Sequence, residues 1–223
     1  TIIVPVDPFK AHLDELARAV KAEKAGPWRR PDLLVATFHV DSPHPAVRLV
    51  PLEVKLRSGH PLSKDESIAA LAQAKALSST LQSIASKGES SHLWRLALGH
   101  LLLSMTSFGI RIYGQNRFLS PDGGREWSRL HESLAAAILG GTADVQVDDR
   151  GRLIVIDSSP ASGPVDRDGD GFAETIVLSL QDAARVMVGD PIPLYQSMRE
   201  QLGGWDVEPG EGPSPATDQA SSR

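Results

Sequence analysis

The chain of 223 residues carries 28 acidic and 23 basic side chains, a net charge of −5, and no cysteine. This length can bury a sufficient core without covalent cross-links, and the missing cysteines exclude disulfides, zinc–cysteine centres and thiolate catalysis. The acidic balance argues against a surface that coats nucleic acid generally, because such binding depends on neutralising phosphates.

The longest apolar run, at about residues 96–105, is interrupted by Gly99 and His100 and is too short to span a bilayer. No signal-peptide pattern opens the sequence. We therefore expect a soluble, cytoplasmic protein that does not engage a membrane.

The first half of the chain predicts a short strand, a helix and a hairpin. Residues 1–6 are β-branched, and residues 10–23 place apolar side chains at helical spacing. Residues 33–40 and 47–56 are apolar and β-prone, and the turn-forming residues 41–45 separate them, so the pair is expected to form a β-hairpin.

The second half predicts helices followed by strands. The longest helix is expected at residues 63–87, where apolar residues form one stripe. In chain order there follow an apolar helix at 91–106, a strand at 109–113, an amphipathic helix at 125–139, a hairpin within 145–156 that turns at 148–151, a strand at 174–178 and a helix at 180–188. This order is typical of an α/β fold in which helices flank a central mixed sheet.

One domain is expected over residues 1–202, with a core at about 10–113 and a β-rich extension at about 125–202. Residues 203–223 are rich in Gly, Pro, Ser and acids and cannot bury enough apolar surface to order themselves, so we expect a flexible linker. This tail, and a start at Thr1 in place of Met, indicate a domain of a longer protein.

Charged side chains in the predicted hairpin form the strongest candidate site. Asp32 opens the first strand, and Glu53 and Lys55, two residues apart in the second, project from one face. Leu52, Val54 and Leu56 are expected on the opposite, core-facing side. Neighbouring strands would bring Asp32 beside Glu53, and two adjacent carboxylates suit Mg²⁺ or Mn²⁺.

Such a site has the parts that phosphodiester hydrolysis requires. The carboxylates with their metal can organise a nucleophilic water and relieve charge in the transition state. Lys55 would orient or deprotonate the water, or stabilise the developing charge. The less specific interpretation is a hairpin that carries a chance salt bridge, because short motifs recur by chance.

Pro31-Asp32 and, after twenty residues, Glu53-Val54-Lys55, followed by a predicted helix, resemble the PD-(D/E)XK nuclease superfamily. The resemblance implies a restriction-endonuclease-like αβββαβ core and Mg²⁺-dependent cleavage of DNA. In the RecB-like branch a glutamine on the next helix supports the metal site; Gln73 matches it, whereas Leu77 stands where that branch usually has an aromatic residue.

Many members of this superfamily also use an acid on the first helix. Glu15 is the candidate metal ligand here, with Asp14 and Glu23 as rivals and His12 one turn earlier. A nuclease-like domain followed by a linker is also similar to nuclease modules of HerA/FtsK-like ATPases in anti-phage restriction, phosphorothioate-linked systems included. The resemblance implies DNA and a fused or associated ATPase or helicase as partners, with restriction or repair as the role.

Two alternatives stay open. The chain could be a nuclease-fold module that binds DNA or an ATPase without cutting. Separately, Asp166, Asp168 and Asp170 match the first half of a Ca²⁺-binding loop, but position 12 is Val177 in place of glutamate, which favours a polar hairpin turn over a calcium-stabilised interaction domain.

Overall fold

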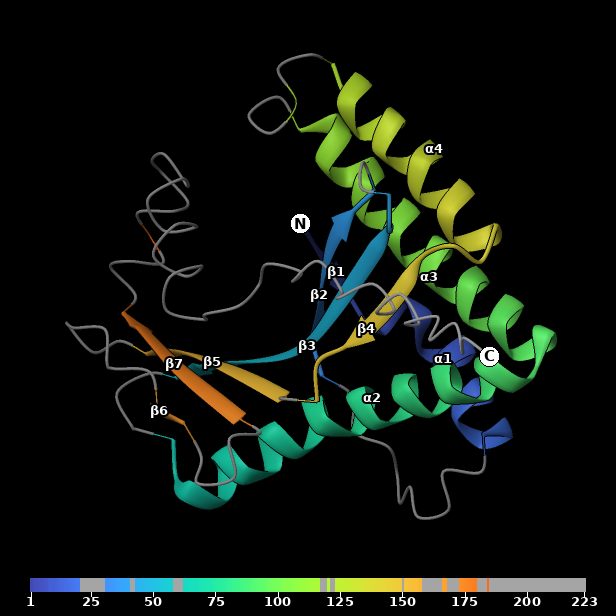
Figure 1. Cartoon of the computed structure of the whole chain (residues 1–223). Coiled ribbons are helices and arrows are strands. Elements are labelled where there is room, and N and C mark those ends of the chain that lie inside the picture. Colours follow the sequence, from blue (N-terminus) through green and yellow to red (C-terminus); the bar gives the residue numbers. More distant parts are fainter. Residues whose placement is uncertain are drawn as a thin grey trace, which may run out of the picture.

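The computed structural model describes residues 1–20, 31–40, 43–57, 62–116, 120, 123–149, 151–157, 166–167, 173–179 and 184. Within these ranges a seven-stranded sheet packs against α-helices (Figure 1). The elements are β1 (Ile2–Pro5), the 3-10 helix η1 (Asp7–Phe9), α1 (Lys10–Ala19), β2 (Leu33–His39), β3 (Ala46–Arg57), α2 (Lys64–Ser90), α3 (His92–Gln115), α4 (Arg125–Leu139), β4 (Asp144–Val147), β5 (Gly151–Asp157), β6 (Asp166–Arg167) and β7 (Ala173–Ser179).

The sheet is mixed, which confirms the predicted α/β class. Its strand order is β1-β2-β3-β5-β7-β6, and β4 pairs with β3. β1, β2 and β3 are successively antiparallel, whereas β3, β5 and β7 are parallel. The predicted hairpin is confirmed, because β2 and β3 pair from His39 opposite Ala46 to Leu33 opposite Leu52. One strand, β1, comes before α1, so the chain order is not literally αβββαβ.

The hairpin predicted within residues 145–156 is wrong. β4 and β5 both run parallel to β3, one after the other along its length. Leu49 of β3 pairs with Val147 of β4, and Leu52 of β3 pairs with Arg152 of β5. From the first pair to the second, β3 advances by three residues and the partner segment by five. The chain between these pairs is therefore two residues longer on the β4–β5 side than on β3, and the Asp148 amide donates to the Leu49 carbonyl at 2.8 Å.

The strand predicted at residues 109–113 is also wrong, because α3 continues as a helix to Gln115. Gly109 lets this helix approach β1 closely: a Cβ atom there would lie 2.7 Å from Ile2 Cδ1 and 3.0 Å from Val4 Cγ2. Among the described residues, α3 is long and apolar enough to cross a membrane, a property that core helices of soluble proteins share. In this fold, 44% of its most apolar stretch is buried inside the protein.

The main core lies between the β1–β2–β3 part of the sheet and helices α2, α3 and α4. Alternate strand residues face these helices, as in β1, where Ile2 and Val4 are fully buried and Ile3 is 37% exposed. The expected core-facing role of Leu56 is wrong, since its side chain is 71% exposed. Buried members of this core include Leu13, Leu34, Leu49, Leu77, Leu81, Ile84, Leu101, Leu102, Met105 and Leu134.

Three of the remaining predicted elements lie within the described residues. The helices predicted at 63–87 and 125–139 are confirmed as α2 and α4, and the strand at 174–178 as β7. The helix predicted to start at residue 10 is described as far as Ala19. Residues 180–188, apart from 184, and 203–223 lie outside the described residues.

A capping box formed by Ser63 and Glu66 marks the N-terminus of α2, the helix that follows β3. The Ser63 hydroxyl accepts from the Glu66 amide at 3.3 Å, and Glu66 Oε2 accepts from the Ser63 amide at 3.0 Å. This pair satisfies two of the amide donors that a helix start leaves without partners inside the helix.

Ser63→Ala is expected to lower the free energy of unfolding by about 1 kcal/mol, the usual cost of losing an N-cap. Urea denaturation measures this change. Ser79→Ala, an exposed position within the same helix, is the control and should change stability little. Equal effects of the two substitutions would contradict the role of the cap.

Candidate functional site

Asp32 and Glu53 face each other where β2 begins. Because Leu33 pairs with Leu52, the preceding residue Asp32 stands opposite Glu53. The Asp32 amide donates to Glu53 Oε2 at 3.1 Å, and Asp32 Oδ2 accepts from the Val54 amide at 3.0 Å. The predicted juxtaposition of these two carboxylates is therefore present in the fold.

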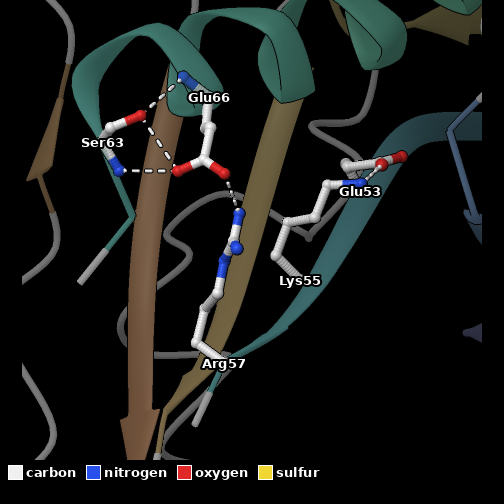
Figure 2. A network of polar contacts seen from close by, with 5 residues as sticks. All are labelled: Glu53, Lys55, Arg57, Ser63 and Glu66. Atoms are coloured by element: carbon white, nitrogen blue, oxygen red, sulfur yellow. Dashed lines mark hydrogen bonds and ion pairs between the residues drawn. The ribbon is translucent and has the colours of Figure 1, made fainter. Parts of the chain in front are cut away.

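Lys55 completes a three-residue cluster. Its Nζ lies 2.5 Å from Glu53 Oε1, and Figure 2 shows the ammonium group reaching back along β3 to that carboxylate. The Glu53 side chain is 2% exposed, whereas that of Lys55 is 33% exposed. The cluster thus consists of a buried carboxylate (Glu53), an exposed one (Asp32) and an ammonium group that reaches solvent.

Helix α2 explains why Glu53 is buried. Glu53 pairs with Leu153 of β5, so the two side chains lie on one face of the sheet. Leu153 packs against Ala70 of α2 in a small apolar cluster. The charged face of β3 is therefore the face that α2 covers.

Burial raises the pKa of the Glu53 carboxyl above its ordinary value of 4.5. The negative charge of Asp32 raises this pKa further, whereas the hydrogen bond from Lys55 and the charge of Lys55 lower it. The direction is the one expected when desolvation outweighs a single partner.

This shift predicts a pH dependence of stability. The folded chain holds a proton on Glu53 more tightly than the unfolded chain, so the stabilisation is complete below about pH 4.5 and is lost as the pH rises through the raised value. Relative to Glu53→Gln, whose side chain does not titrate, the wild-type protein should lose unfolding free energy over this range. Urea titrations in EDTA between pH 4 and 8 measure the difference, and a constant difference would contradict the shift.

The two carboxylates fit a hard divalent cation. Mg²⁺ is commonly held by one or two carboxylates, with water and substrate phosphate completing its shell. A cation would also offset the repulsion between Asp32 and Glu53 that contributes to the raised pKa. Across the residues that the structure describes, no three or more His, Asp or Glu side chains gather as a metal-binding group, so any ion here would depend on this pair.

A second polar network begins two residues after Lys55, at Arg57 of β3. Arg57 projects from the same strand face as Glu53 and Lys55, and its Nη2 donates to Glu66 Oε1 at 2.7 Å (Figure 2). The hydrogen bonds from Ser63 and the one from Arg57 lower the pKa of Glu66, which therefore stays ionised. The Ser-x-x-Glu spacing at 63–66 is the sequence signal for the capping half of this network.

The two supporting candidates are not joined to the cluster by described contacts. Gln73 lies in α2, is partly buried, and within the described residues donates no hydrogen bond to Asp32, Glu53 or Lys55. Glu15 is exposed on α1, a helix that contacts α3 through the rings of His12 and His100 at 5.9 Å. Glu23, a rival of Glu15, lies outside the described residues.

The possible calcium loop is described only in part. Asp166 lies in β6 and pairs with Thr175 of β7 in an antiparallel arrangement, whereas Asp168 and Asp170 lie outside the described residues. Strands on both sides agree with the hairpin interpretation of this segment.

Comparison of the chain with protein-family models, with curated proteins and with solved structures found no match.

Proposed function

We propose that the chain is an Mg²⁺- or Mn²⁺-dependent nuclease domain with a restriction-endonuclease-like core that hydrolyses DNA phosphodiester bonds. The observation that carries this proposal is Asp32 opposite Glu53 at the start of a hairpin, with Lys55 Nζ 2.5 Å from Glu53. Antiparallel strands, followed after three helices by strands parallel to β3, support the proposed core. A cytoplasmic restriction or repair complex with an associated ATPase is the proposed setting.

Asp32, Glu53 and Lys55 have different roles in the proposed reaction. Asp32 and Glu53 would hold the ion, which would supply polarisation of water and phosphate oxygens. Glu53 is kept in place by the Asp32 amide and by Lys55. Lys55, one third exposed, can turn its ammonium group to a phosphate oxygen or a water at the surface of the site.

Two cations on one face of β3 offer contacts for a phosphodiester substrate in an acidic protein. Lys55 and Arg57 project from one strand face, and Arg57 is 31% exposed although it pairs with Glu66. Each of these cations, although paired with a carboxylate, has further N–H donors that can contact a phosphate oxygen.

The test is incubation of the protein with plasmid and with linear DNA in Mg²⁺, in Mn²⁺ and in EDTA. Cleavage in either metal and none in EDTA is the expected result. Complete absence of products in both metals would contradict the proposal for the isolated chain.

A second candidate function is DNA or partner binding without cleavage. It is favoured by the hydrogen bonds that already engage the site: Lys55 occupies Glu53 Oε1, and the Val54 amide occupies Asp32 Oδ2. Fluorescence anisotropy of a labelled duplex in EDTA, combined with product analysis in Mg²⁺ and in Mn²⁺, separates the two candidates, because a binding module retains affinity for DNA and yields no product in any metal.

A further inference from the structure

A cavity of about 500 Å³ lies between the second half of α3 and the first half of α4. Its volume falls within the range of small-molecule sites, roughly 300–1,000 Å³. Gly114 and Gly124 let the two helices meet closely at one end, since a Cβ atom on Gly124 would lie 2.8 Å from the Gly114 carbonyl oxygen. The cavity belongs to elements that carry none of Asp32, Glu53 and Lys55.

A hydrogen-bonded serine and histidine line this cavity. Ser107 Oγ of α3 lies 2.6 Å from Nε2 of His131 of α4. Other helical hydroxyls, such as those of Ser104 and Thr106, donate to the carbonyl four residues earlier. The Ser107 hydroxyl instead joins the two helices, and both residues of the pair line the cavity.

Opposite charges line the same cavity without pairing with each other. Arg111 of α3 and Glu132 of α4 are both exposed, and neither forms an ion pair with another residue in the described part of the chain. Trp127 and Ile110 supply flat and aliphatic surface between them, and the Trp127 ring packs on Tyr113 at 5.2 Å. A ligand that satisfies this lining needs an anionic group, a planar apolar body and hydrogen-bond donors.

We propose that the α3–α4 cavity binds a nucleoside monophosphate. Arg111 pairs with the phosphate, for which a guanidinium has matching donor geometry. The base lies against Trp127, because aromatic side chains stack with any nucleobase. Glu132 accepts hydrogen bonds from ribose hydroxyls or a base amine, and the Ser107–His131 pair offers a further donor and acceptor in the lining.

Isothermal titration of the whole chain in EDTA with AMP, GMP, CMP and UMP tests this proposal, and neither nuclease activity nor metal is required. At least one nucleotide should bind saturably. Adenosine alone and inorganic phosphate alone should each bind about tenfold more weakly or worse, since each lacks half of the recognised groups. Phosphate that binds as tightly as the nucleotides would overturn the proposal, and so would the absence of binding by all four.

Variants locate the site. Arg111→Gln should weaken nucleotide binding about tenfold or more, because a charge-assisted contact is lost. Arg129→Gln removes an exposed arginine of α4 that does not line the cavity, and should leave binding unchanged. Ser107→Ala should also weaken binding. Equal affinities for wild type and Arg111→Gln would place the nucleotide elsewhere and refute the assignment.

Discussion

Lys55→Ala is expected to reduce metal-dependent DNA cleavage by at least about 100-fold, the usual loss when one group that moves a proton or stabilises charge is removed. The Lys55 ammonium group contacts the buried carboxylate, and its side chain is 33% exposed and reaches solvent. Its removal also leaves Glu53 without the hydrogen bond that lowers its pKa, so the carboxylate becomes harder to ionise. Initial rates of plasmid nicking in Mg²⁺ measure the effect.

Two further variants keep this result interpretable. Lys55→Gln retains a hydrogen-bond donor near Glu53 but carries no charge, so it should fold as the wild type does and still lose cleavage. Lys10→Ala removes an exposed lysine at the start of α1 and should leave the rate unchanged. Wild-type rates in both Lys55 variants would refute the catalytic role, and if cleavage were absent in all proteins, including the wild type, the binding module would be favoured.

Gly151→Ala is expected to lower the free energy of unfolding by about 1–3 kcal/mol, the usual cost of overpacking a core. At this position β5 touches α2: a Cβ atom would lie 2.8 Å from Ala74 Cβ, 3.0 Å from the Leu71 carbonyl oxygen and 3.0 Å from the Lys75 amide nitrogen. Two of these neighbours are backbone atoms, so α2 must shift as a unit. The fall in Tm should be roughly 2–10 °C for a domain of this size, measured by circular dichroism.

Gly88→Ala is the matched control for this substitution. Gly88 also lies in a tightly packed region, but the nearest atoms to its added Cβ are at ordinary contact distances of 3.4 Å and more from Arg95. Within a helix, alanine is favoured over glycine by about 1 kcal/mol, so stability should stay constant or rise. Equal destabilisation by the two substitutions would show that the approach of α2 to β5 is not the cause.

Local sequence patterns were sufficient for the hairpin and its charged residues. The two-residue period of β3 fixes which side chains share a face, and a short turn fixes the antiparallel partner, so Asp32, Glu53 and Lys55 could be placed together before any coordinates. Burial of Glu53 was not accessible in this way, because it depends on α2 crossing the sheet above Leu153.

Contacts between distant segments explain the predictions that failed. Residues 109–113 resemble a strand locally, but packing of Gly109 on Ile2 keeps them in α3. Residues 148–151 resemble a hairpin turn, but β4 and β5 each pair in parallel with β3. Leu56 alternates with its neighbours as expected, but it projects from the face opposite the one that α2 covers, and its side chain is exposed.

The parallel pairing of β3 with β5 has a consequence for how the chain folds. Leu52 and Arg152 are neighbours in the sheet although α2, α3 and α4 lie between them in the sequence. Contacts between residues so far apart in the sequence form slowly, because the long intervening segment must first bring its ends together. The β2–β3 hairpin, in contrast, joins adjacent segments. The hairpin that sets Asp32 beside Glu53 is therefore expected to form early, whereas burial of Glu53 by α2 and β5 depends on the later, long-range contacts.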